Sequence, residues 1–223
     1  PDGASAVVLP LGCGFGISLL AALPAAFALV CGFTLRAVLL GGAGAALLCA
    51  VLVFTGRGHA RFAKDPDRGA MWLCLLPLLA VTLYLLHTHV LHAINGTLHT
   101  GQSCYGDMPM HLGFIEYIAQ SGQFPPQYPL LAGAHRFGYP FLCETVSSVF
   151  RVLGAGRRAA YLLPMVPACI SVYGMFWQLA RRVLGSAGKA SLAFYLFFMG
   201  SGFGFVYFLK DAEAFKSIFT GFY

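Results

Sequence analysis

The residues of this chain best suited to chemistry are Asp107 and His111, a carboxylate and an imidazole that lie four positions apart. Side chains with that spacing share one edge of a helix. The pair could be a base with its orienting partner, two metal ligands, or a local hydrogen bond. Asp107 also suits a purely structural role, because Asp is a preferred N-cap residue and Pro109 fits the first turn of a helix.

Three other polar positions are candidates for a site. Glu144 lies among apolar residues near an expected helix start. It could be a second functional carboxylate, or it could only compensate the helix dipole. Arg136 is the best candidate in the polar region 93–158 for binding a phosphate, because a guanidinium can donate to two phosphate oxygens at once. Cys104 and Cys143 are the cysteines outside apolar runs, and they could pair in an oxidising compartment.

Composition predicts a protein that crosses a membrane. The 223 residues are 58% hydrophobic and only 10% charged, whereas soluble domains carry about 25% charged residues. Apolar runs of about 20 residues span a bilayer as helices, so the fold class is an all-α, polytopic transmembrane helical bundle. The net charge of +6 is assigned to basic residues that flank the spans, and nucleic-acid binding is excluded.

Five spans are expected, at about 6–33, 37–55, 70–92, 159–180 and 189–209. The first two and a basic loop form an N-terminal region, 1–69, and the rest forms a second region, 70–223. Loops 56–69 and 181–189 hold seven of the 14 Lys and Arg residues in short stretches. Such loops face the cytoplasm, which puts the polar region 93–158 outside.

The outer region 93–158 is predicted to fold as a helical cap. One helix should begin at Asp107 and run to about Gln120, with an apolar face that could lie on the bilayer surface. A second should run from near Pro140 to Leu153, with Gly154 as its stop. The proline-rich stretch 124–129 should be extended between them. His87, His89, His92 and His99 have poor spacing for a metal and are interpreted as interfacial residues.

A family resemblance rests on residues of this outer region. After a span come Tyr105-Gly106-Asp107-Met108-Pro109-Met110-His111, then Phe124-Pro125-Pro126-Gln127-Tyr128-Pro129-Leu130, then Gly133 and Tyr139-Pro140. This pattern resembles the GT-C superfamily of polytopic glycosyltransferases, which includes the protein mannosyltransferase and aminoarabinose transferase relatives. The resemblance covers about 82–209. Because that family has more spans, and because the chain starts at Pro1, an N-terminal fragment is expected.

The resemblance implies an activity and roles for particular residues. A sugar would move from a polyprenyl-phosphate donor to an acceptor hydroxyl, with inversion, at the outer face of a bacterial cell membrane. Asp107 would be the base, His111 would orient it or join a divalent metal, and the phosphate would meet Arg136, Arg157 or Arg158. Partners would then be membrane lipid, the donor and an unknown acceptor. The alternatives are a non-catalytic membrane partner protein and a transporter or channel subunit.

Overall fold

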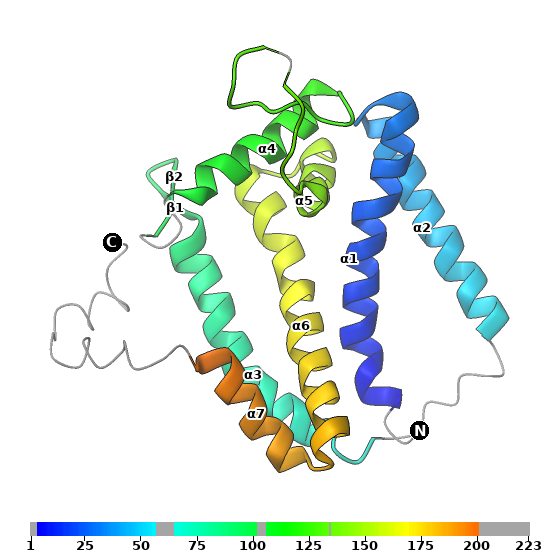
Figure 1. The fold of residues 1–223 in the computed structure, drawn as a ribbon, viewed down its shortest axis with the longest axis vertical. Helices are drawn as coiled ribbons and strands as arrows, with labels where there is room; N and C mark the ends of the chain where they lie inside the picture. Colours follow the sequence, from blue (N-terminus) through cyan, green and yellow to red (C-terminus); the bar gives the residue numbers. More distant parts are fainter. Residues whose placement is uncertain (1–3, 57–64, 102–105, 134, 201–223) are drawn as a thin grey trace, which may run out of the picture. The chain divides into compact units, whose positions relative to one another are not determined.

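The computed structural model describes residues 4–56, 65–101, 106–133 and 135–200. These residues form seven α-helices, one π-helical turn and one short β-hairpin (Figure 1). The predicted all-α class is therefore confirmed. The elements are α1 (Ala4–Cys31), α2 (Leu35–Gly56), α3 (Arg68–Leu85), η1 (Leu86–Val90), β1 (His92–Ile94), β2 (Thr97–His99), α4 (Asp107–Ser121), α5 (Leu142–Val152), α6 (Arg157–Leu184) and α7 (Ala187–Met199).

Four helices are long and apolar enough to cross a membrane. They are Ala6–Cys31, Leu35–Gly56, Arg68–Val90 and Arg157–Leu184, and they agree with the first four predicted spans. A bilayer interior offers no water to the backbone, so apolar runs of this length satisfy their amides within a helix. The helix α7 has only 13 residues, and the predicted fifth span beyond residue 200 lies outside the described residues.

The chain divides into two compact units that interleave along the sequence. Unit 1 consists of Pro1–Pro10, Ala63–Tyr105 and Cys169–Tyr223, and unit 2 consists of Leu11–Phe62 and Gly106–Ala168. The helices α1 and α6 therefore contribute residues to both units.

Unit 1 has its core between α3, α7 and the second part of α6. Met71, Leu75, Trp177 and Phe194 are each at most 1% exposed and belong to one apolar cluster. The Trp177 indole donates to the Ser191 hydroxyl over 3.0 Å. Buried Trp needs such a partner for its N–H, and the bond fixes α7 against α6.

An ion-pair cluster closes one end of unit 1. Arg181, in the last turn of α6, binds the Asp67 carboxylate through Nε at 2.6 Å and through a terminal nitrogen at 2.5 Å. Asp65 lies 3.7 Å from the same guanidinium, and its second oxygen accepts a 3.5 Å bond from Gln178. The start of α3 and the end of α6 thus lie together.

The hairpin of unit 1 was not predicted from the sequence. β1 and β2 are antiparallel, with His92 opposite His99. Asn95 and Gly96, at the turn, have φ angles of 49° and 82°, the conformation of a tight primed turn. The signal was the Asn-Gly dipeptide, which favours this turn because both residues tolerate positive φ.

Unit 2 joins the α1–α2 turn to the end of α4. The Phe33 amide donates to the Gly122 carbonyl over 3.0 Å, and Phe33 is 1% exposed in the core of the unit. Gly32 has a φ of +70°, and a Cβ there would lie 2.2 Å from the Gly122 oxygen, so only glycine fits this approach. The α1–α2 turn and the end of α4 therefore lie together within unit 2.

The cap helices α4 and α5 agree closely with the predicted bounds. The helix α4 begins at Asp107 and ends where Gly122 takes the left-handed conformation. The helix α5 ends at Val152, followed by Gly154 with a φ of +93°. The two helices pack on each other, and the buried Ser148 hydroxyl donates to the Ile115 carbonyl over 3.1 Å. Figure 1 shows both at the end of unit 2 where α1 leads into α2.

Candidate functional site

The central feature of unit 2 is a pair formed by the buried Glu144 of α5 and the partly buried His111 of α4. The His111 Nδ1 lies 2.7 Å from the Glu144 Oε1, and the two side chains are 27% and 4% exposed. The sequence predicted both as candidates but paired His111 with Asp107. Glu144 and His111 meet because α4 and α5 pack face to face, a contact between residues 33 positions apart.

This pair lines a cavity of about 270 Å³ that lies within unit 2. Ile17 of α1 and Pro164 and Met165 of α6 provide apolar walls. The remaining lining residues are Ile115, Cys143, Val146, Ser147, Tyr161 and Ala168. An apolar hollow with a few convergent polar groups is the usual form of a ligand site.

Two polar residues of the cavity were missed from the sequence. Ser147 follows Glu144 by three positions, so that both fall on one face of α5. Tyr161 lies one turn beyond Arg157 and Arg158, which were already candidates. Helical spacing from the chosen residues would have found both side chains. The sequence alone offered no reason to prefer the faces of α5 and α6 on which these two side chains lie.

Asp107 occupies the first turn of α4 and is exposed. Gly106, not Asp107, takes the N-cap position, and no side chain caps the helix. Within the described part of the chain, the Asp107 carboxylate forms no hydrogen bond or ion pair. The structural interpretation of Asp107 as an N-cap is therefore wrong. Its carboxylate remains available one helical turn from His111.

Glu116 joins α4 to α5 and to the start of α6. Arg151 binds it with Nε at 2.6 Å from Oε1 and a terminal nitrogen 3.1 Å from Oε2, and the Arg157 Nε lies 3.4 Å from Oε1. Partial burial raises the pKa of Glu116, but the hydrogen bond and charge of Arg151 and the charge of Arg157 outweigh it. The net pKa lies below its ordinary value. Glu116 is therefore the centre of an ion-pair cluster.

Arg136 lies in a different hollow from the His111–Glu144 pair. That hollow measures about 510 Å³ and is formed by the loop between α4 and α5. The two hollows share none of their lining residues. The Phe114 ring stands between them, with its centroid 6.2 Å from that of His111 and 4.6 Å from that of Phe137. From the sequence, Arg136, Arg157 and Arg158 were candidates to bind the same phosphate. In the structure, Arg136 does not line the cavity.

Cys143 is a free thiol at the edge of the cavity. Its Sγ donates to the Glu144 Oε2 over 2.8 Å. Burial raises the pKa of Cys143 to about 11, and the hydrogen bond and charge of Glu144 act in the same direction. The suggested disulfide with Cys104 is not formed, and Cys104 itself lies outside the described residues. Both Glu144 oxygens are thus hydrogen-bonded.

A resident metal ion has little support from the donor atoms. Among the described residues, no group of three or more His, Cys, Asp or Glu side chains could hold one. The Glu144 oxygens are already engaged by His111 and Cys143.

Comparisons with protein families, with curated proteins and with solved structures found no match for this chain. The interpretation of the site therefore depends on its geometry and on the residues it brings together. Geometry and chemistry of this kind, rather than fold class, are the proper basis for assigning a function.

Proposed function

We propose that this chain carries the donor side of a membrane glycosyltransferase. It moves a sugar from a polyprenyl phosphate to an acceptor hydroxyl, with inversion, at the outer face of a bacterial cell membrane. The observation that supports this most is the His111–Glu144 pair in the wall of an apolar cavity. Asp107 lies one helical turn away on the same helix.

The cavity walls suit the lipid part of such a donor. Ile17, Pro164 and Met165 belong to helices long enough to cross the membrane. Branched isoprene units fill hollows lined by aliphatic side chains without leaving polar groups unpaired. The lipid would enter from the bilayer, and its phosphate would remain near the polar edge.

The start of α6 suits the phosphate. Arg157 and Arg158 occupy its first turn, one turn before Tyr161 of the cavity wall. A helix N-terminus carries partial positive charge and exposed amides, which favour anions. The Arg157 guanidinium is 59% exposed, and its Nε lies 3.4 Å from the Glu116 Oε1. Because most of its surface is open, it can bind a second anion.

The reaction needs one base and one group that stabilises the departing phosphate. Asp107 takes the proton of the acceptor hydroxyl as its oxygen forms a bond with the anomeric carbon. The bond from that carbon to the phosphate oxygen breaks, and polyprenyl phosphate leaves with the electron pair. The leaving charge is stabilised by hydrogen-bond donors aimed at it.

The His111–Glu144 pair suits that second role. Glu144 accepts at the His111 Nδ1, which fixes the ring and leaves Nε2 to meet the substrate. With a hydrogen on Nε2 as well as on Nδ1, the His111 ring would donate to the departing phosphate oxygen.

The test is transfer of radiolabelled sugar from a panel of polyprenyl-phosphate donors by the protein in membranes. Asp107→Asn should lower the rate of transfer by about a thousandfold, since general base catalysis contributes factors of this size. His111→Gln should lower it by about a hundredfold. Tyr117→Phe is the matched control, because this side chain lies on the same helix but outside the cavity, and its hydroxyl donates to Gln123.

Three results would refute the proposal. Transfer by Asp107→Asn at the wild-type rate would show that Asp107 is not the base. A protein that binds no polyprenyl phosphate and folds normally would favour a non-catalytic membrane partner. Uptake of a solute that requires Glu144 and not Asp107 would favour a transporter, for which buried ionisable groups are typical.

A further inference from the structure

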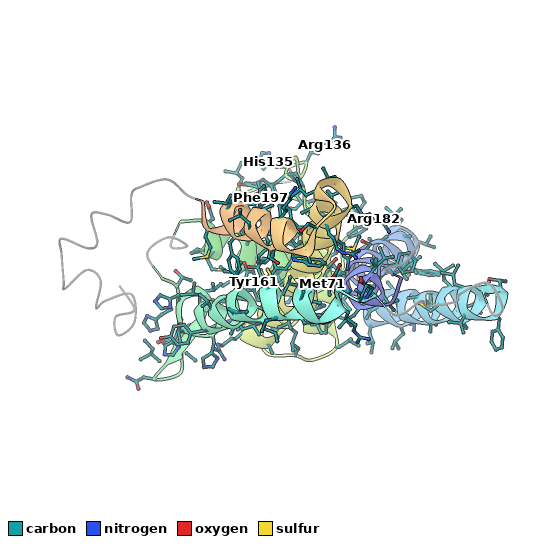
Figure 2. All side chains as sticks on the ribbon, turned by 90° about the horizontal axis from the view of Figure 1, so that it is seen from below. Met71, His135, Arg136, Tyr161, Arg182 and Phe197 are labelled. Atoms are coloured by element: carbon teal, nitrogen blue, oxygen red, sulfur yellow. The ribbon has the colours of Figure 1, made fainter. Side chains whose placement is uncertain are left out.

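The loop between α4 and α5 forms a second site that the donor reaction does not use. Its hollow is lined by Pro125, Pro126, Gln127, Phe137 and Phe141 around the side chains of His135 and Arg136. Figure 2 shows His135 and Arg136 projecting from this loop. The hollow is larger than the His111–Glu144 cavity, at about 510 Å³ against about 270 Å³.

The backbone of this loop holds Arg136 in place. Arg136 pairs with Gln127 in an antiparallel bridge, and the Tyr128 amide donates to the His135 carbonyl over 3.0 Å. The next residue, Phe137, is 7% exposed and stacks on Phe141 with centroids 5.2 Å apart. The backbone that carries the exposed Arg136 guanidinium is therefore held by the bridge to Gln127 and by the buried ring of Phe137.

The charge of Arg136 is not neutralised within the described part of the chain. The carboxylates of Asp65, Asp67, Glu116 and Glu144 each have an ion-pair partner, and Arg136 is not among those partners. Of the described carboxylates, none lies within 4.0 Å of its guanidinium. An exposed guanidinium carried on a backbone held in this way is suited to two oxygens of an anionic ligand.

The other groups of the hollow suit a sugar. The His135 Nε2 lies 2.8 Å from the Ala132 carbonyl, which can only accept, so this nitrogen carries the hydrogen and Nδ1 is left as an acceptor. The Gln127 amide can donate to and accept from hydroxyl groups. The flat walls of Pro125, Phe137 and Phe141 offer apolar area to the carbon face of a ring.

We propose that this hollow binds the acceptor and that the acceptor is a saccharide carrying a phosphate group. The word acceptor rests on the proposed transferase function, whereas the binding of a phosphorylated saccharide does not. Arg136 would hold the phosphate, and the aromatic and proline walls would hold the sugar ring. The hydroxyl that accepts the sugar would extend from this hollow past the Phe114 ring toward the lipid donor.

The test measures binding without any donor, by ligand-observed NMR on the protein in nanodiscs. The probes are glucose 6-phosphate, glucose and inorganic phosphate. Glucose 6-phosphate should bind about tenfold more tightly than either of the others, since one charge-assisted contact is worth about that factor. Arg136→Gln should reduce its affinity to that of glucose.

Arg36→Gln is the matched control. Arg36 is also an exposed arginine of unit 2, and it lines a separate hollow with Cys31, Thr34, Leu35 and Leu39. The control should bind glucose 6-phosphate as the wild type does. An equal loss in both variants would show general attraction of anions and would overturn the site.

Three further outcomes decide the ligand. Equal affinity for inorganic phosphate and glucose 6-phosphate would overturn the saccharide part. Displacement of glucose 6-phosphate by phosphatidylglycerol in the nanodisc would identify a lipid headgroup site and overturn the proposal. Where transfer is observed, Arg136→Gln should raise KM for a phosphorylated acceptor about tenfold at unchanged kcat. Normal binding with no transfer would refute the transferase function alone.

Discussion

Two carboxylate clusters, one in each unit, differ in how completely they are neutralised. In unit 1, Asp65 and Asp67 share one guanidinium, that of Arg181, and Asp65 also accepts from Gln178. In unit 2, Glu144 faces a histidine and a thiol and lines a cavity. The first cluster has a permanent cation, and the second has a partner whose charge depends on a proton.

This difference separates a structural cluster from a candidate functional one. An arginine keeps its charge at any accessible pH, so the unit 1 cluster is a fixed clamp between α3 and α6. A histidine can gain or lose a proton near neutral pH. A buried carboxylate–histidine pair beside a cavity can therefore take part in a reaction, whereas the arginine clamp can only hold helices together.

The largest expected effect comes from breaking the clamp. Arg181→Ala leaves two carboxylates without their cation, one of them with a fully buried side chain, and should lower the free energy of unfolding by about 4 kcal/mol. Thermal unfolding in detergent would measure this. Arg182→Ala is the control, because the neighbouring Arg182 is exposed (Figure 2) and its loss should cost less than about 0.5 kcal/mol. Similar losses in both variants would contradict the clamp.

The second effect concerns activity rather than stability. Glu144→Gln keeps the shape of the side chain but removes its charge, so the His111 ring loses the carboxylate that accepts from its Nδ1. Transfer should fall about a hundredfold, while the free energy of unfolding changes by less than about 1 kcal/mol. If the variant lost much stability but kept normal activity per folded molecule, Glu144 would have a structural role like that of the unit 1 carboxylates, which would contradict this prediction.

The third effect tests the Glu116 ion pairs, which resemble the clamp but lie in unit 2. Glu116→Gln should lower the free energy of unfolding by about 2 kcal/mol at neutral pH. Because the pKa of Glu116 is lowered in the folded state, its contribution is present above the ordinary carboxyl pKa and is lost as pH falls through the folded value. Stability of the wild type should therefore decline in acid more steeply than that of the variant. Parallel acid curves for the two proteins would refute this.

The smallest effect reports the charge of Glu144 directly. With a pKa of about 11, Cys143 is about 0.1% thiolate at pH 8, and thiolate is the reactive form. In a variant that retains only this cysteine, maleimide should label slowly. Adding Glu144→Gln removes a charge and an acceptor, and the labelling rate should rise about tenfold. Adding Glu116→Gln instead should leave the rate unchanged, and an unchanged rate in both would show that Glu144 is uncharged.

Local patterns in the sequence predicted most of the helices. Apolar runs gave the four long spans, and Asp107, Pro109 and the apolar spacing behind them gave α4 from its first residue. Gly154 marked the end of α5. These signals depend on residues within a few positions of each other. The β-hairpin was missed although the Asn95-Gly96 signal was present, because the strands on either side of it have only three residues each.

The sequence by itself determined which residues are candidates, and the tertiary structure decided how they are grouped. Helical spacing placed His111 near Asp107, but the hydrogen bond of His111 goes to Glu144, across the contact of α4 with α5. The fold likewise separated Arg136 from the cavity and tied Arg157 to Glu116. Spacing along a helix fixes which side chains share a face. Which neighbour that face meets depends on packing between distant segments, and no short stretch of sequence contains it.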